Sequence, residues 1–202
     1  IDRSGNDHLV IEDLCIAGPS GRTLLEGFNA TVRRGEWVLV TGDSAVTSRF
    51  FKVLAGLWSW GSGRVALPDG DGTLFLPQRP LVPDGTLREA LCYPRTTDEF
   101  DDAETRRALE QAGLGWLLPR LDDTDHWDQV LPLQAQQRLG FARVLLQRPA
   151  WIFMEDASTA FDPQSEQQLL EVLQRELPRT ALLTVSLHPG LGPLHHRTLE
   201  LA

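Results

Sequence analysis

The sequence is poor in cysteine, and this excludes several kinds of small stapled domain. Its two cysteines, Cys15 and Cys92, lie far apart in the chain. Such a pair provides neither a disulfide framework nor the ligand spacing of a metal site. The sequence also lacks any run of about 18 apolar residues, the length needed to cross a membrane, and shows no signal-peptide pattern. Because the chain starts at Ile1 rather than Met, we expect it to be a fragment of a longer protein.

Positive charge is scarce relative to negative charge. The formal net charge is −9 and the sequence pI is about 5.0, which argues against a nucleic-acid partner. The arginines are dispersed, so no basic run is available for an anionic membrane surface. A hydrophobic content of 42% suffices for a sizeable core, and 202 residues correspond to one domain, or to one domain with a small subdomain.

Apolar runs typical of strands alternate with segments of helical periodicity along most of the chain. Thr86 and Glu89 have the form of a capping box, and Asp162 followed by Pro163 is a good helix start. This alternation predicts an α/β fold with a mainly parallel core sheet. We expect strands at 8–17, 28–32, 37–41, 63–67, 73–76, 151–154, 180–186 and 198–201, and helices at about 47–57, from 86, at 98–112, at 134–147 and from 163, with a turn at 68–70 and irregular chain at 122–129.

One stretch, residues 37–57, has the order of a strand, a tight turn at Gly42 and a helix. This is the frame of the phosphate-binding P-loop, G-x-x-x-x-G-K-[ST], but Thr47, Ser48 and Arg49 stand in place of the second glycine, the lysine and the hydroxyl residue. Arg49 would point roughly 100° around the helix from the lysine direction. The stretch is either a weak phosphate site or a structural strand–turn–helix. The candidate nucleotide-binding residues are Gly42, Asp43, Ser44, Ala45, Val46, Thr47, Ser48 and Arg49.

Several further motifs follow this stretch in a characteristic order. They are residues 54–58 (LAGLW) with 61–65 (GSGRV), 76–80 (LPQRP), 85–91 (GTLREAL), 136–139 (QQRL) and 141–143 (FAR). Over about residues 8 to 202 the chain therefore resembles the nucleotide-binding domain of ABC transporters. It most resembles the type in which one polypeptide carries a membrane domain followed by one cassette, as in peroxisomal fatty-acyl and bacterial peptide or vitamin B12 transporters.

The resemblance implies a P-loop NTPase fold of the RecA-like type. The α/β core would contain a small antiparallel β region and would carry a helical subdomain. The resemblance places the RecA-like core at about 1–80 and 148–202 and the helical subdomain at about 84–147. Gln78 matches the glutamine that contacts Mg²⁺ and the attacking water in the family.

The carboxylates at the end of the expected strand 151–154 are a departure from the family. The resemblance implies Asp-Glu, where the first residue holds Mg²⁺ and the second polarises the attacking water, but the chain has Glu155 and Asp156. Glu155 is then the candidate metal residue and Asp156 the candidate catalytic residue. Each side chain differs by one methylene, about 1.3 Å, and a misplacement of about 1 Å can cost 10²-fold in rate.

Two further family motifs are altered. The signature segment at 131–138 has Pro132, which removes a hydroxyl and an N–H donor, and Gln134 in place of a glycine. The family histidine falls on Leu187, and a shift of one residue would make His188 the contact to the γ-phosphate. Asp162 matches an aspartate that signals across the cassette dimer, and it also fits an N-cap.

These observations leave two functional hypotheses. In the first, the chain is the cassette of an ABC transporter on the cytoplasmic face of a membrane, with ATP and Mg²⁺ as cofactors and impaired hydrolysis. Its partners are a membrane domain and a second cassette, with no nucleic acid. In the second, it is a pseudo-ATPase that serves as a structural or regulatory partner. A DNA-repair cassette would need a basic surface and long insertions that the sequence lacks.

Overall fold

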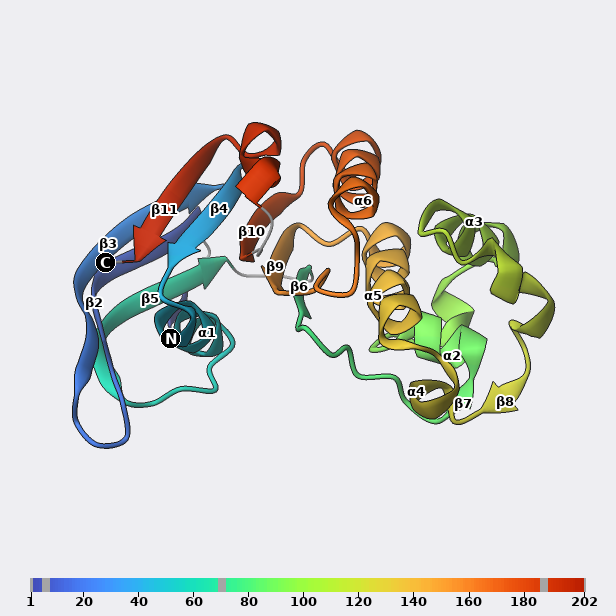
Figure 1. Cartoon of the computed structure of the whole chain (residues 1–202), viewed down its shortest axis with the longest axis horizontal. Coiled ribbons are helices and arrows are strands. Elements are labelled where there is room, and N and C mark those ends of the chain that lie inside the picture. The colour runs from blue at the N-terminus through green and yellow to red at the C-terminus, as the bar shows by residue number, and fades with distance from the viewer. Residues whose placement is uncertain (1, 5–7, 69–71, 186–188, 202) are drawn as a thin grey trace. The chain divides into compact units, whose positions relative to one another are not determined.

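The computed structural model describes residues 2–4, 8–68, 72–185 and 189–201. The chain forms two compact units (Figure 1). The sheet unit consists of Ile1–Phe75, Ala150–Glu155 and Arg179–Ala202, and the helical unit of Leu76–Pro149 and Asp156–Pro178. None of the described helices is long and apolar enough to span a bilayer.

A largely buried sheet forms the centre of the sheet unit. Its strand order is β11 (Arg197–Leu201), β4 (Trp37–Gly42), β10 (Ala181–Val185), β9 (Trp151–Glu155) and β6 (Thr73–Leu76). β4 is parallel to both of its neighbours, and β10 is parallel to β9. The continuous apolar runs of β4, β9 and β10 are explained by this arrangement, because strands of a parallel sheet are covered on both faces. The predicted parallel core sheet is confirmed.

A second sheet packs in the same unit, with the order β1 (Asp2–Ser4), β5 (Gly61–Pro68), β2 (His8–Ala17) and β3 (Thr23–Arg33). β2 is antiparallel to β3 and to β5. One hydrophobic core joins buried residues of both sheets with those of α1 (Ser44–Leu54). Partly buried Phe28 packs against this core, where its ring meets that of buried Phe50 edge to face, with centroids 5.9 Å apart.

One strand assignment needs a correction. Residues 63–67 and 73–76 form strands as expected, but these do not pair with each other around a common turn. β5 belongs to the antiparallel sheet and β6 lies beside β9 in the other sheet. Partner choice depends on contacts remote in sequence, which local turn residues do not reveal. Residues 69 and 70 of the turn that we expected at 68–70 lie outside the described residues.

Several helices of the helical unit start at a side-chain cap. Thr86 accepts the backbone N–H of Glu89, whose carboxylate accepts the N–H of Thr86, so the predicted capping box is confirmed. Asp162 caps α6 by accepting the N–H of Ser165, also as predicted. The unit contains β7 (Gly85–Thr86), α2 (Leu87–Cys92), η1 (Thr97–Glu99), α3 (Asp102–Gln111), η2 (Gly115–Arg120), β8 (Thr124–Asp125), α4 (Trp127–Val130), α5 (Leu133–Gln147) and α6 (Pro163–Glu176), while η3 (Pro189–Leu194) belongs to the sheet unit.

Two expectations in this unit were wrong in detail. The helix predicted from residue 98 starts at Asp102, because Asp101 caps it by accepting the N–H of Glu104 at 2.7 Å. The segment expected to be irregular, 122–129, contains β8 and most of α4. Buried Trp127 anchors it by donating from Nε1 to the carbonyl of Gly85 at 3.1 Å.

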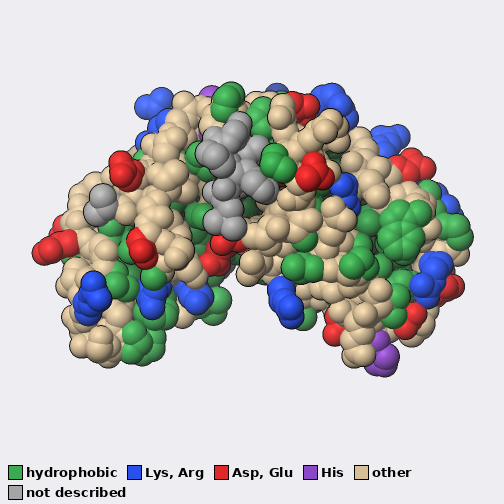
Figure 2. Space-filling model, in the orientation of Figure 1, with side chains coloured by type: hydrophobic (Ala, Val, Ile, Leu, Met, Phe, Trp, Pro, Cys, Tyr) green, Lys and Arg blue, Asp and Glu red, His purple; other side chains and the backbone are tan. Residues whose placement is uncertain are grey.

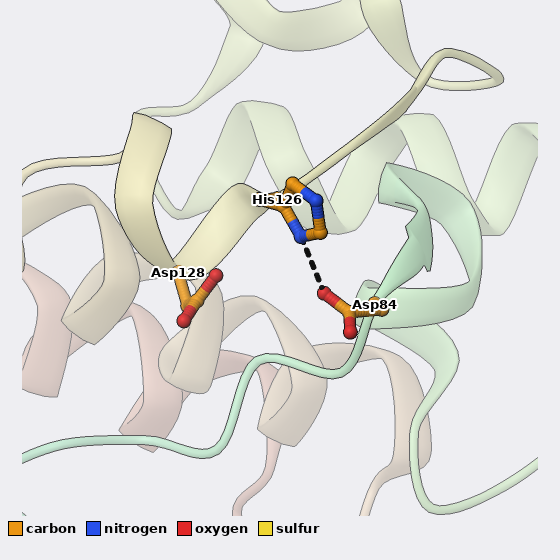
Figure 3. Close-up of side chains that lie close together, drawn as sticks. All are labelled: Asp84, His126 and Asp128. Carbon is orange, nitrogen blue, oxygen red and sulfur yellow. Dashed lines mark hydrogen bonds and ion pairs between the residues drawn. The ribbon is translucent and has the colours of Figure 1, made fainter.

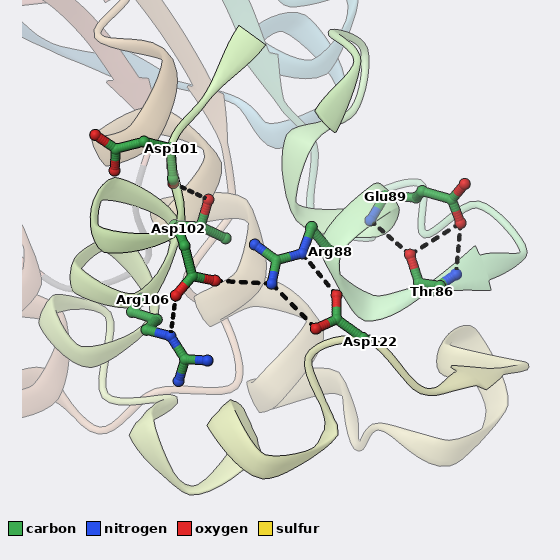
Figure 4. A network of polar contacts seen from close by, with 8 residues as sticks. Thr86, Arg88, Glu89, Asp101, Asp102, Arg106 and Asp122 are labelled. Atoms are coloured by element: carbon green, nitrogen blue, oxygen red, sulfur yellow. Dashed lines mark hydrogen bonds and ion pairs between the residues drawn. The ribbon is translucent and has the colours of Figure 1, made fainter. Parts of the chain in front are cut away.

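Arg88 joins α2 to α3 and to the chain before β8 (Figure 4). Its guanidinium donates to Asp122 at 2.7 Å and to Asp102 at 2.8 Å. The pKa of Asp122 is lowered mainly by Arg88, and that of Asp102 by Arg106 and then by Arg88.

Figure 2 shows acidic and basic side chains interspersed over the visible face of both units.

Candidate functional site

Gly42 ends β4 at the position where the P-loop frame begins. Its φ is +145°, a value that side-chain-bearing residues rarely adopt. A Cβ added there would lie 2.7 Å from the carbonyl oxygen of Leu201. The close approach of β11 therefore requires a glycine at this position whether or not a phosphate binds.

The helix after Gly42 starts earlier than we predicted. α1 begins at Ser44 instead of at about Thr47. Asp43 is its N-cap, and the Asp43 carboxylate accepts the backbone N–H of Ala45 at 2.8 Å. The carbonyl of Asp43 accepts the N–H groups of Val46 and Thr47, both at 2.9 Å. Residues 43 to 50 include no glycine, and the chain enters a helix directly after Asp43. An aspartate at the N-cap favours this conformation.

This geometry uses the groups that a phosphate loop presents to its ligand. In a P-loop, backbone N–H groups and the positive end of the helix dipole face the phosphates. Here the N–H groups of Ala45, Val46 and Thr47 are bonded to Asp43, which places a carboxylate at that helix end. The Val46 and Thr47 side chains are buried, whereas those of Asp43, Ser44 and Ala45 are exposed.

The cation of the segment is directed along α1. Arg49 donates from Nη1 to the carbonyl of Ala45 at 2.6 Å, and its guanidinium lies 5.2 Å from the ring centre of Trp58. Trp58 is fixed in turn by donating from Nε1 to the carbonyl of Ala17 at 3.0 Å. A guanidinium over an indole ring is an attractive cation–π pair, so the charge of Arg49 is engaged within the sheet unit.

Glu155 and Asp156 are half-buried and follow the buried part of β9. Glu155 is the last residue of the strand in the sheet unit, level with Val185 of β10. Asp156 begins the next segment of the helical unit with a φ of +50°. Aspartate tolerates this left-handed conformation better than most residues, so the backbone turns sharply between the two carboxylates.

Gln78 lies in the helical unit, on an exposed bend after β6. Its side-chain Nε2 is 3.4 Å from Oγ1 of Thr159, to which it donates. Thr159 belongs to the turn that starts at Asp156, and its N–H donates to the carbonyl of Asp156 at 3.3 Å. The helical unit therefore brings Gln78 together with the turn that follows the second carboxylate.

Comparisons with known proteins bear on this arrangement. A solved bacterial Atm1-family ABC exporter with ATP bound matches the whole chain with a TM-score of 0.85 at 19% identity, over 38% of the exporter chain. An uncharacterised ABC transporter ATP-binding protein of Haemophilus influenzae is 35% identical over 194 residues, 96% of this chain and 33% of that protein. No family model matches the chain.

Two further relatives are also ABC transporter proteins. An inner membrane ABC transporter ATP-binding protein of Escherichia coli, YddA, is 31% identical over 91% of this chain and 32% of that protein. The human lysosomal cobalamin transporter ABCD4 is 31% identical over 95% of this chain and 34% of that protein. The chain thus spans about a third of the length of the curated relatives that it matches. The chain belongs to the ABC transporter ATP-binding family.

In this cassette the signature segment keeps its helix. α5 begins at Leu133 with Pro132 as its N-cap, which provides no side-chain cap. The carbonyl of Pro132 accepts the N–H groups of Ala135 and Gln136 at 2.9 and 3.1 Å. Gln134 is exposed on the first turn. The structure thus places the helix of the segment where expected, with the two altered residues at its start.

The remaining predicted site residues are divided between the two units or lie outside the described residues. Gln78 and Glu155, the expected Mg²⁺ contacts, belong to the helical and the sheet unit respectively. His188 and the adjacent Leu187 lie outside the described residues.

A different set of residues has ligand atoms close enough to hold a metal ion. The ligand atoms of Asp84, His126 and Asp128 lie within 4.8 Å of one another, and all three residues are exposed (Figure 3). Nδ1 of His126 is 3.0 Å from Oδ1 of Asp84, and this hydrogen bond raises the pKa of His126. This group could not be predicted from the sequence, because the pairing of Gly85 with Asp125 brings together segments that are remote in the chain.

Proposed function

We propose that this chain is the nucleotide-binding domain of an ABC transporter, with impaired ATP hydrolysis at its own phosphate loop. It would act on the cytoplasmic face of a membrane, together with a membrane domain and a second cassette. The relatives that are named as ABC transporter ATP-binding proteins support the transport role. We further propose the family's division into a RecA-like core at about 1–80 and 148–202 and a helical subdomain at about 84–147.

The observation that carries the impairment is the self-capped start of α1. The Asp43 carboxylate and carbonyl accept the backbone N–H groups of Ala45, Val46 and Thr47 in the first turn of the helix. An incoming phosphate would have to displace this cap and would meet a like charge beside it. Ser48 brings no charge, and Arg49 is bonded to the turn behind it. Tight ATP binding would therefore need contacts outside this loop.

The roles of the other candidate residues follow from the family resemblance. Gln78, Asp156 and His188 would act on the attacking water and the γ-phosphate, and Gln78 and Glu155 would contact Mg²⁺. The ion, when bound, would neutralise charge on the phosphates. The family has Asp-Glu where this chain has Glu155 and Asp156, so each side chain differs in length by one methylene. This difference favours slow hydrolysis even when nucleotide is bound.

A second candidate function is a pseudo-ATPase that stabilises or regulates an active partner cassette. Pro132 and Gln134 favour it, because they stand at the start of the segment that contacts the nucleotide of the opposite subunit in the family. In this case the chain provides surfaces for the partner while its own loop stays empty.

One titration separates the two candidates. A fluorescent ATP analogue is added with Mg²⁺ to the purified chain, and binding is followed by anisotropy. Micromolar binding would rule out the pseudo-ATPase. No binding at millimolar nucleotide would rule out the transporter motor at this site. Weak binding in the intermediate range, with little hydrolysis, is the result that we expect for an impaired cassette.

A further inference from the structure

Gln137 is a buried polar residue in the middle of the helical unit. Its exposure is 1%, on a helix, α5, that is otherwise buried largely through apolar residues. A buried amide is costly unless its donors and acceptor are bonded. An apolar residue of the same size would fill this place without that requirement. The hydrogen bonds of Gln137 therefore indicate a role beyond packing.

Those contacts join two irregular segments. Nε2 of Gln137 donates to the carbonyl of Gln78 at 2.8 Å and to Oγ1 of Thr159 at 3.0 Å. Oε1 accepts the backbone N–H of Ala160 at 3.0 Å. The side chain thus holds the bend at Gln78 on one side and the turn at Thr159 and Ala160 on the other. Neither segment belongs to a helix or strand that would fix these groups.

α5 also holds the far end of the Gln78 bend. Arg143 donates from Nη1 to the carbonyl of Leu81 at 2.6 Å, and from Nε and Nη2 to the carbonyl of Ala90. Burial lowers the pKa of Arg143 to about 10. With one end of the bend fixed through Arg143, its other end is held by Gln137 and by the direct hydrogen bond from the Gln78 side chain to Thr159.

We propose that Gln137 is a positioning residue that couples the Gln78 bend to the Thr159–Ala160 turn, so that a displacement of either segment is passed to the other. What the segments contact rests on the proposed function. Under that function Gln78 would contact Mg²⁺ and the attacking water, and the turn would lead to Asp162, which would signal across the cassette dimer. Gln137 itself touches neither nucleotide nor metal, and it acts through these segments.

The chain offers a matched control in the adjacent residue. Gln136 also donates two hydrogen bonds from its Nε2, to the carbonyls of Asp128 and Leu131 at 2.7 and 2.8 Å. Gln136→Met and Gln137→Met therefore remove the same chemical groups from the same helix. Only the second removes the contacts to Gln78, Thr159 and Ala160.

The test is NMR spectroscopy of the 202-residue chain without nucleotide. In Gln137→Met the carbonyl carbon of Gln78 should shift, and the amide of Ala160 should exchange about fivefold faster, as expected for one lost hydrogen bond. Gln137→Glu keeps an acceptor for the Ala160 N–H but no donor. It should shift the Gln78 signal and leave Ala160 exchange unchanged. Gln136→Met should change neither.

Coupling is tested by a double-mutant cycle. Because the Gln78 side chain also donates directly to Oγ1 of Thr159, the cycle is run in a Gln78→Ala background, which removes that contact and keeps the carbonyl of residue 78. In this background Thr159→Val should shift the residue-78 carbonyl signal, and it should have no such effect when Gln137→Met is also present. An equal shift with and without Gln137→Met, or the same response to Gln136→Met and Gln137→Met, would overturn the proposal. Should Gln137→Met not fold, Thr159→Val in the Gln78→Ala background decides, since an unchanged residue-78 carbonyl signal there contradicts coupling. Because no nucleotide is used, failure of ATP binding is a separate outcome.

Discussion

Under the proposed function, Asp43 is the residue that distinguishes this phosphate loop from a tightly binding one. It was expected as part of a phosphate loop, but its carboxylate caps α1. The sequence signal was present, because an aspartate before a helical segment is a common N-cap. The P-loop frame around Gly42 favoured a later helix start. The departures from the P-loop motif at residues 47–49 are visible in the sequence. The cap depends on backbone geometry, which a motif match does not describe.

Replacing Asp43 tests the cap directly. Asp43→Ala should lower the free energy of unfolding by about 1 kcal/mol, because the Ala45 N–H loses its acceptor. Asp43→Asn keeps an acceptor oxygen and should stay close to the native value. Urea denaturation of the three proteins measures the differences. Equal losses in both variants would show that the charge of Asp43, and not its hydrogen bond, stabilises the helix.

Among the elements, those with local signals were predicted best. The caps at Thr86 and Asp162 and the continuous apolar strands are encoded within a few neighbouring residues, and the structure has them where expected. The pairing of β5 and β6 with different sheets was missed because it depends on long-range contacts. The Asp84, His126 and Asp128 group was missed for the same reason.

The Arg88 network gives a pH prediction at this scale. The pKa values of Asp102 and Asp122 are lowered in the folded state. Their stabilisation is therefore present above the ordinary aspartate pKa of about 3.9, and it is lost as the pH falls through the lower folded-state values. Arg88→Met should be less stable than the native chain at pH 7, and this difference should shrink toward pH 2.

Urea midpoints between pH 7 and pH 2 measure this difference. Arg107→Met, at an exposed position on α3, is the control and should follow the native curve. A difference between Arg88→Met and the native chain that is independent of pH would show that Arg88 acts through packing rather than through the two carboxylates.

At the scale of the whole molecule, the fold is similar to that of a solved protein with which few residues are identical. The chain matches an ABC exporter with a TM-score of 0.85 at only 19% identity. Fold class and family could therefore be read from the sequence, since they depend on many apolar and turn positions. The site could be read only as departures from a motif, because the consequence of each departure depends on what the substituted side chain contacts.

Because the departures are spread over the chain, a single reversion should restore little. Ser48→Lys should improve the affinity for a fluorescent ATP analogue by less than about tenfold, or 1.4 kcal/mol. Thr47, Asp43 and Pro132 stay as they are in this variant, so the capped helix start and the altered signature segment persist. An improvement of several hundredfold would show that the missing lysine alone weakens the site.

The most direct test of the account is an NMR titration of the native chain with Mg²⁺-ATP, following the backbone amides of Ala45, Val46 and Thr47. These N–H groups donate to Asp43 in the structure. We predict that their signals move little at micromolar nucleotide and do not saturate there. Large shifts of all three amides that saturate together at micromolar Mg²⁺-ATP would show that the loop opens to hold phosphate, and would contradict the account.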